Sequence, residues 1–139
     1  MRMLKLFIEK TVRGRGIVFI NQKNQVKEVC DFIDKEMPKL RYISLHGELT
    51  QKERLTNFKN FAAGKGQILF ATDVAARGID IKDAQWVLNY GLPKTAIYYL
   101  HRCGRTGRAG NKGLSIAFIS SRGVSSSNIS TRQDSGKCV

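Results

Sequence analysis

Five short, predominantly apolar runs recur along the chain, and each has the length of one β-strand. They lie at residues 17–20, 42–45, 67–71, 86–90 and 114–118. Apolar runs that lack polar alternation are typical of strands covered by helices on both faces, as in a parallel sheet. The first run follows Gly14 and Gly16, and we interpret it as a central strand.

The intervals between these runs carry the 3.6-residue spacing of amphipathic helices. The first such helix is expected to end before Pro38, and its apolar face is formed by Val26, Cys30, Ile33 and Met37. Asn21 precedes this helix and is a candidate N-cap. A further helix is indicated at the N-terminus, where Leu4, Phe7 and Ile8 share one face.

Two more helices are indicated by their first residues. Thr50 and Glu53 match a capping box, in which each side chain bonds the backbone N–H of the other residue. We expect the helix after them to bury one apolar set: Leu55, Phe58 and Ala62. Thr95 is a candidate N-cap for a helix before the last strand.

Strands alternate with helices at short connections, so the pattern predicts right-handed crossovers and a doubly wound α/β fold. We expect a mostly parallel sheet of five strands or more, with helices on both faces. Ligands of such sheets bind at the carboxyl ends of the strands. The polar segments that follow the strands should therefore share one edge: Asn21, residues 46–47, residues 72–73 and Gly91.

A chain of 139 residues with 42% hydrophobic and 25% charged residues has the composition of one globular domain. We assign residues 1–120 to this domain. Residues 121–139 are rich in serine and lack apolar periodicity, so we expect a disordered tail there.

The chain is strongly basic. Lys and Arg number 24 against 11 for Asp and Glu, which gives a formal net charge of +13. From Ala84 onward the only acid is Asp134, so the basic excess lies toward the C-terminal side. Such a charge favours a polyanionic partner, nucleic acid above all, although a solvated basic surface explains the charge alone equally well.

The three cysteines, Cys30, Cys103 and Cys138, are widely spaced and include no C-x-x-C pair, so we expect neither a metal site nor a disulfide framework. A reducing compartment fits this usage, and we expect the cytoplasm or the nucleus, with an organelle as the alternative. No apolar run reaches the ~18 residues that a membrane span requires, so we expect no membrane partner.

The segment 101–110 places three arginines among glycines. Arg102, Arg105 and Arg108 alternate with glycines at positions 104, 107 and 110. Arginine presents a planar fork of donors, which bonds phosphate oxygens in pairs and stays protonated at any working pH. Small neighbours leave these side chains room to reach outward. We interpret the segment as directed at phosphate rather than as a flexible basic turn.

A second candidate segment, residues 71–80, directly follows a predicted buried strand. We expect Thr72 to offer a hydroxyl and a free backbone N–H to a phosphodiester oxygen. Asp80 offers a carboxylate of the kind that binds ribose hydroxyls. Taken singly, an N-cap role for Thr72 and a turn-forming role for Asp80 are equally good interpretations.

Together these segments resemble motifs of the DEAD-box RNA helicases, a family of superfamily 2. Residues 71–80 are similar to motif V with Va, and residues 101–110, H-R-C-G-R-T-G-R-A-G, are similar to motif VI. Residues 17–21 resemble motif IV, and His46-Gly47 with Q-x-x-R at 51–54 resembles the IVa and Q-x-x-R segment. The resemblance covers the whole predicted domain and implies a RecA-like C-terminal helicase lobe.

The resemblance also implies roles for individual residues. Arg105 and Arg108 would be catalytic fingers on the γ-phosphate of ATP, and Gly78 and Asp80 would complete the ATP site on this lobe. The residues implied to hold the RNA backbone are Asn21, Gly47, Arg54 and Thr72. The residues implied to couple this lobe to an N-terminal lobe, which holds ATP with its Mg²⁺, are His101 and Arg102.

The sequence contains neither a G-x-x-x-x-G-K-[ST] phosphate loop nor a D-E-A-D run. We therefore expect an N-terminal lobe to act with this chain in cis or in trans, and the chain alone to be inactive toward ATP. Two alternatives stay open: a stand-alone RNA-binding or regulatory module, and a truncated fragment without ATPase activity. Cys103 stands where the family usually has an aliphatic residue, an apolar exchange that should leave the arginines in place.

Overall fold

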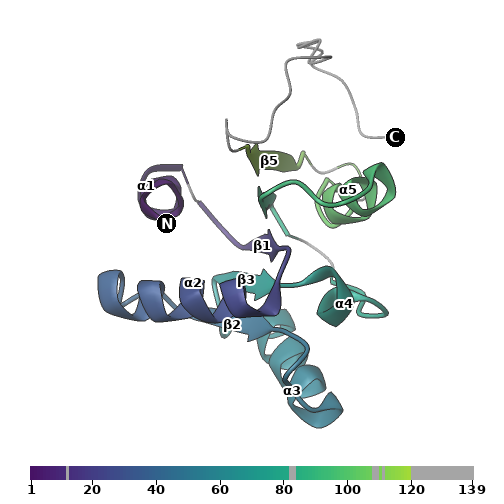
Figure 1. Ribbon diagram of the computed structural model, residues 1–139, viewed down its shortest axis with the longest axis horizontal. Helices are drawn as coiled ribbons and strands as arrows, with labels where there is room; N and C mark the ends of the chain where they lie inside the picture. Colours follow the sequence, from purple (N-terminus) through teal and green to yellow (C-terminus); the bar gives the residue numbers. More distant parts are fainter. Residues whose placement is uncertain (12, 82–83, 108–109, 111, 120–139) are drawn as a thin grey trace.

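A computed structural model describes residues 1–11, 13–81, 84–107, 110 and 112–119, and strands and helices alternate along them (Figure 1). The strands are β1 (Gly16–Ile20), β2 (Tyr42–Leu45), β3 (Ile68–Ala71), β4 (Trp86–Tyr90) and β5 (Leu114–Phe118). The helices are α1 (Arg2–Thr11), α2 (Lys23–Glu36), α3 (Gln51–Ala62), α4 (Asp73–Ala76) and α5 (Ala96–Cys103). Each apolar run of the sequence is thus a strand, whereas the predicted tail, 121–139, lies outside the described residues.

The five strands form one parallel sheet in the order β2-β3-β1-β4-β5. β1 is the central strand, as its sequence predicts. Its Val18 lies opposite Phe70 of β3 on one side and opposite Leu88 of β4 on the other. Because every strand runs the same way, all the carboxyl ends meet at one edge of the sheet.

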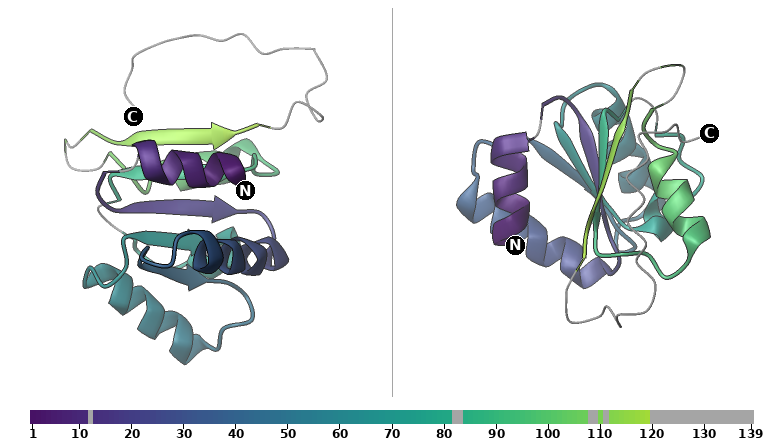
Figure 2. Two further views of the ribbon diagram at one scale, coloured as in Figure 1. Left: turned by 90° about the vertical axis from the view of Figure 1, so that its left-hand side faces the viewer. Right: turned by 90° about the horizontal axis from the view of Figure 1, so that it is seen from above.

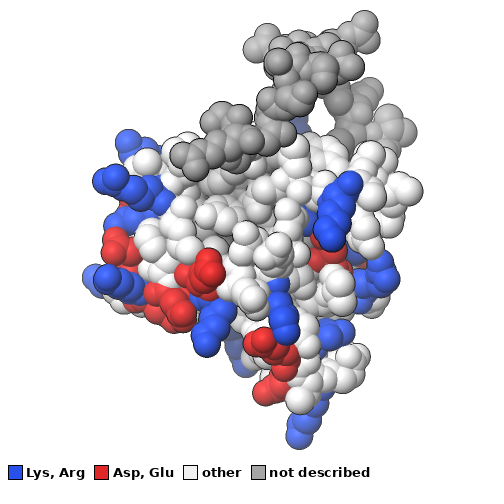
Figure 3. Space-filling view, viewed as in Figure 1, with Lys and Arg blue, Asp and Glu red and all other residues white. Residues whose placement is uncertain are grey.

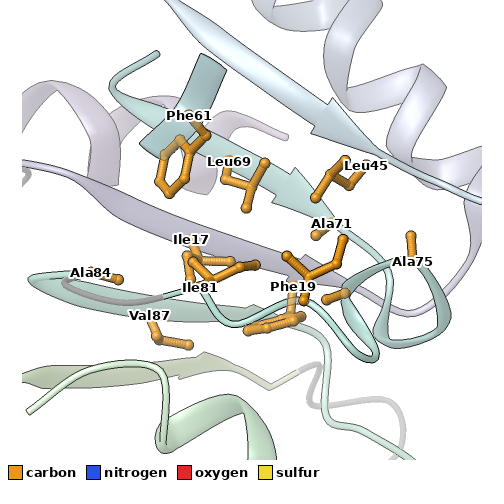
Figure 4. Packing of buried hydrophobic residues seen from close by; sticks show 12 residues of the cluster. Ile17, Phe19, Leu45, Phe61, Leu69, Ala71, Ala75, Ile81, Ala84 and Val87 are labelled. Carbon is orange, nitrogen blue, oxygen red and sulfur yellow. The ribbon is translucent and has the colours of Figure 1, made fainter. Parts of the chain in front are cut away.

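Helices cover both faces of this sheet (Figure 2). α1 and α2 lie on one face, where they pack on Val18 and Ile20 of β1. α3, α4 and α5 lie on the other face, where Ile17 and Phe19 join a second apolar cluster with Phe61 (Figure 4). Every residue of β1 is therefore buried, which is the physical reason for its unbroken apolar run.

The N-terminal helix α1 covers the side of the sheet where β4 and β5 lie. Leu4 and Ile8 on its inner face are buried, and the Phe7 ring meets the Trp86 ring edge-on, with centroids 5.5 Å apart. The predicted inner face of this helix is confirmed. Trp86 in turn needs Gly16, since a Cβ at that position would lie 1.9 Å from its indole ring.

Two details of the helices differ from expectation. The N-cap of α2 is Gln22, which makes no side-chain cap bond, because the Asn21 amide bonds elsewhere. The inner face of α3 centres on Phe61, which is 1% exposed, and not on Leu55, which is 45% exposed. Phe58 is half-buried, whereas Ala62 is exposed, so the buried stripe is displaced around the helix from the predicted one.

None of the helices among the described residues has the length and apolar character needed to cross a membrane.

Leu69 and Leu55 provide a matched test of this packing. Leu69 is fully buried in β3, so Leu69→Ala should lower the free energy of unfolding by about 2–5 kcal/mol. Leu55→Ala deletes the same atoms from an exposed helical position and should change it by less than about 0.5 kcal/mol. Urea denaturation measures both values, and equal losses would contradict the orientation of α3.

Candidate functional site

The polar segments that follow the strands do share one edge of the sheet. The backbone N–H of Thr72, after β3, donates to the carbonyl oxygen of Leu45 at the end of β2 (3.1 Å). The side-chain amide of Asn21, after β1, donates to the carbonyl oxygen of Leu92, after β4 (2.9 Å). These bonds join the carboxyl ends in two pairs, β2 with β3 and β1 with β4, as the parallel topology predicts.

Arg102 of α5 holds this edge together from the inside. Its Nε and Nη2 donate to the two carboxylate oxygens of Asp73, at 2.8 and 2.6 Å. Nη2 also donates to Asn21 Oδ1 at 2.8 Å, and Nη1 donates to Asn89 Oδ1 at 3.1 Å and to the Gly91 carbonyl oxygen at 3.4 Å. The bidentate pair with Asp73 is the geometry that makes an arginine–carboxylate bond strong and directional.

The burial of Arg102 bears on its predicted role in coupling two lobes. The side chain is 1% exposed and spends its donors within this chain, and its guanidinium carbon lies 5.3 Å from the centre of the Phe19 ring. Coupling through Arg102 stays a prediction, and with its donors used within the chain Arg102 would couple the lobes only through the residues that it holds. His101, the other predicted coupling residue, is exposed.

Two of the four residues assigned to RNA are engaged within the chain. Asn21 uses its amide oxygen for Arg102 and its amide nitrogen for Leu92. Thr72 is buried, its hydroxyl accepts from the N–H of Ala75 as the N-cap of α4, and its backbone N–H is bonded to Leu45. The expected free N–H at Thr72 is therefore wrong, because the end of β2 lies close enough to accept it.

Of the other two, Gly47 lies in the turn between β2 and α3, and Arg54 lies in the first turn of α3. A Cβ at Gly47 would meet nothing within 4 Å, so the backbone there is open to a ligand. Arg54 is half-buried on the inner side of α3, and its Nε is a buried donor without a partner among the described residues. Such a donor is costly unless a ligand or water accepts from it.

The predicted capping box fixes the start of α3 beside this turn. Thr50 Oγ1 accepts from the Glu53 N–H, and the Glu53 carboxylate accepts from the Thr50 N–H at 2.7 Å. These bonds from the Thr50 backbone and hydroxyl hold the pKa of Glu53 below its ordinary value. The stabilisation is present above the ordinary pKa of a glutamate and is lost as the pH falls through the lowered one.

The structure also brings together residues assigned to ATP. Arg105 Nη1 donates to the carbonyl oxygen of Ile79 at 3.0 Å, which places this guanidinium beside Gly78 and the exposed Asp80. Gly78 has a φ of +74°, a conformation that favours glycine, and a Cβ there would meet nothing within 4 Å. Arg108 lies outside the described residues.

A cavity of about 520 Å³ opens between α4 and α5. Gly78, His101 and Arg105 line it, together with Arg77 and Tyr98, to which the sequence assigned no role. Arg77 Nη2 donates to the Tyr98 hydroxyl at 2.9 Å and so ties the end of α4 to α5. Lys and Arg side chains lie on the surface over these two helices, with an acidic patch between them (Figure 3). The excess of cations there suits an anionic ligand.

Sequence reasoning missed Asn89 as a residue of this edge, and it placed Asp73 at the edge without assigning it a role or a partner. A signal existed for Asn89, because it is the one polar residue in the apolar run 86–90 and it is fully buried. Asp73 directly follows Thr72 and reads as an ordinary acid in the first turn of a helix. Its pairing with Arg102, which is 29 positions away, leaves no local trace.

Comparison with known proteins identifies the class of domain. A family model described as "Helicase conserved C-terminal domain" matches residues 1–110. The ATP-dependent RNA helicase SrmB of Haemophilus influenzae is 42% identical over 118 residues, which are 85% of this chain and 26% of that protein. The chain thus spans about a quarter of the length of this curated relative.

Solved structures agree with this match. The E. coli DEAD-box protein SrmB, bound to regulator of ribonuclease activity A, has a TM-score of 0.75 at 37% identity, and the match covers 84% of this chain and 67% of that one. Domain 2 of the DEAD-box helicase Mss116p, bound to an RNA duplex, has a TM-score of 0.72 at 34% identity, with 85% of this chain and 46% of that one covered.

The chain belongs to the DEAD-box RNA helicases and corresponds to their C-terminal helicase domain, with the RecA-like fold. The family and the fold class predicted from the sequence are confirmed. The roles of the individual site residues stay predictions, and the contacts described above show where each described residue lies.

The Arg102 network yields a test of stability. Arg102→Met removes the cation from a pair that is largely inside the protein and leaves Asp73 uncompensated, so we expect a loss of about 3–5 kcal/mol in the free energy of unfolding. Arg102→Lys keeps the charge but not the planar fork, so an intermediate loss is expected. Urea denaturation measures both variants. A loss below about 1 kcal/mol for Arg102→Met would show that the network does not support the fold.

Proposed function

We propose that this chain binds the RNA backbone through the loops after β1, β2 and β3, and that Arg105 and Arg108 act on ATP carried by an N-terminal lobe. The enzyme formed in this way is an ATP-dependent RNA helicase. One observation carries the proposal: the contact of Arg105 with the segment 78–80 brings two separately predicted nucleotide-binding elements to the rim of one cavity.

The RNA-binding residues divide into two kinds in this proposal. Gly47 and Arg54 contact phosphates directly, through an open backbone and a half-buried guanidinium. Thr72 offers its hydroxyl hydrogen, because its hydroxyl oxygen already accepts from Ala75. Asn21 acts indirectly by fixing the edge through Arg102. Contacts of this kind position the backbone without reading bases, and the structure of Mss116p domain 2 with an RNA duplex supports the choice of ligand.

The residues on the other side of the edge fit ATP. Arg105 supplies a cation for phosphate, Asp80 an exposed carboxylate for ribose hydroxyls, and Gly78 an open backbone. ATP supplies the phosphoryl group that is transferred to water, and its Mg²⁺ belongs to the N-terminal lobe. Arginine fingers of comparable nucleotide hydrolases raise the rate by roughly 10³ to 10⁵, because they stabilise charge in the transition state.

The exposed side of α5 is our candidate surface for the N-terminal lobe, in cis or in trans. Ile97 and Leu100 are each 65% exposed there, His101 is also exposed, and Ile97 and His101 both line the cavity. Clustered apolar exposure beside a functional cavity is typical of a protein interface. An RNA substrate and the free thiols of Cys30 and Cys103 agree with the cytoplasm or the nucleus as the compartment.

Reconstitution tests the ATP part of the proposal. We expect this chain, mixed with or fused to the N-terminal lobe of its SrmB relative, to hydrolyse ATP when RNA is present, whereas the chain alone does not. Arg105→Gln should lower kcat by about 10³ or more. Lys94→Gln removes an exposed cation nearby and should leave kcat unchanged. A stand-alone RNA-binding module, the alternative, would give no turnover in the mixture.

The RNA part is tested on the chain alone by fluorescence anisotropy between about 50 and 200 mM salt. Arg54→Gln should weaken binding of single-stranded RNA and reduce the slope of log K against log salt by about 0.7. Lys27→Gln on α2 is the matched control, because it removes one exposed positive charge beside Glu28 and Asp31 and should leave the slope unchanged. An affinity that is independent of salt would contradict recognition of the backbone.

A further inference from the structure

The turn that carries Arg105, residues 104–107, is rich in glycine, so fixing its backbone costs much conformational entropy. Glycines at 104, 107 and 110 surround it, and Gly113 follows just before β5. Glycine loses more backbone freedom on folding than any other residue. An arginine that must meet a phosphate in a fixed geometry therefore requires contacts that hold the turn from outside.

Thr106, the residue after Arg105, makes one such contact. Its hydroxyl donates to the carbonyl oxygen of Ala84 at 2.5 Å, and the two residues also form an isolated parallel β-bridge. Ala84 is 4% exposed and belongs to the apolar cluster on this face of the sheet. The turn is thus fixed to the segment that leads into β4.

The second contact is with Gly113, against whose backbone the turn packs closely because this residue has no side chain. A Cβ at this position would lie 2.3 Å from the backbone nitrogen of Gly107 and 2.5 Å from the Thr106 hydroxyl. The N–H of Leu114 donates to the carbonyl oxygen of Gln85 at 3.2 Å, so the start of β5 is itself held beside the start of β4. Only glycine lets the turn lie this close to that pair of strands.

These contacts are separate from those that hold α5. The helix is fixed by the Arg102 network and by a contact between the Cys103 sulfur and the Ser115 hydroxyl at 3.0 Å. Thr106 contributes to neither, and the bridge to Ala84 lies beyond the end of the helix. The backbone N–H of Thr106 also donates to the Cys103 carbonyl oxygen at 3.2 Å. Loss of the Thr106 hydroxyl therefore removes the link to Ala84 and loosens the turn, while the helix and the core stay in place.

We propose that Thr106 and Gly113 are positioning residues for Arg105: they anchor the turn to the starts of β4 and β5 and so hold this arginine in the direction of ATP. The inference rests on the proposed function. Neither residue has a role in binding ATP or RNA in that proposal. Their contribution is preorganisation, which speeds a reaction because the charged group does not have to be rearranged when the transition state forms.

The first test uses the reconstituted enzyme with RNA. Thr106→Val keeps the shape of the side chain but removes the donor, and Thr106→Ser keeps the donor. We expect Thr106→Val to lower kcat about tenfold, the usual scale for an acceptor left without its partner, with KM for ATP and RNA affinity unchanged. Thr106→Ser should restore most of kcat. Wild-type kcat in Thr106→Val would overturn the proposal.

The second test uses the chain alone and needs no turnover. Trypsin cleaves after Arg105, so the rate of cutting at the bond between residues 105 and 106, measured by mass spectrometry, reports how tightly the turn is held. We expect about tenfold faster cutting in Thr106→Val and a wild-type rate in Thr106→Ser. The bond after Lys59, inside α3, is the control and should be cut at the same rate in all three proteins.

The two tests separate the inference from the function on which it rests. If the wild-type mixture does not hydrolyse ATP, the proposed function fails, while the trypsin rates still decide whether Thr106 holds the turn. Unchanged cutting in Thr106→Val overturns the anchoring role. Gly113→Ala should act in the same direction as Thr106→Val, and the Thr106 pair keeps the test decisive if the alanine variant does not fold.

Discussion

The ion pair between Arg102 and Asp73 is the constraint on which the rest of this edge depends. A guanidinium that is 1% exposed has lost its water, and this loss is offset only if its donors meet acceptors inside the protein. The acceptors come from the segments after β1 and β3 and from β4 with the residue that follows it, and the cation itself comes from α5. These four parts of the chain cannot move independently without exposing an uncompensated charge. The segments assigned to RNA and the helix that leads to the arginines assigned to ATP therefore share one support.

Arginines that look equivalent in the sequence have different physical settings. Arg102 is enclosed with a carboxylate, whereas Arg105, three residues later, lies at the rim of the cavity and bonds a backbone carbonyl. The difference arises where α5 ends, because the chain leaves the helix at Cys103 and Arg105 no longer follows its inner face. Arginine thus stabilises the fold at position 102 and lines a cavity at position 105.

Much of the fold follows from the sequence because its signals are local or repeated. Five apolar runs predict five covered strands, and parallel strands place Asn21 and Thr72 at the same edge. The errors come from partners that are distant along the chain. The Thr72 N–H is taken by Leu45, and Asn21 caps no helix because Arg102, 81 positions away, and Leu92 engage its amide. Likewise, the inner face of α3 depends on where Phe61 packs, which the spacing of apolar residues in that helix does not determine.

Asn89 favours one register of β4 in the sheet over the registers shifted by one residue. It lies opposite Phe19 of β1, and its side chain projects, like that of Val87, toward the face of the sheet on which Arg102 lies. Leu88 projects toward the opposite, apolar face, which α1 and α2 cover. A slip of one residue would turn the amide into that apolar layer and deprive Arg102 of an acceptor, at a cost that purely hydrophobic strands would not incur. A single polar side chain in the middle of an apolar strand therefore discriminates against misaligned pairings during folding, in addition to completing the edge once the correct pairing has formed.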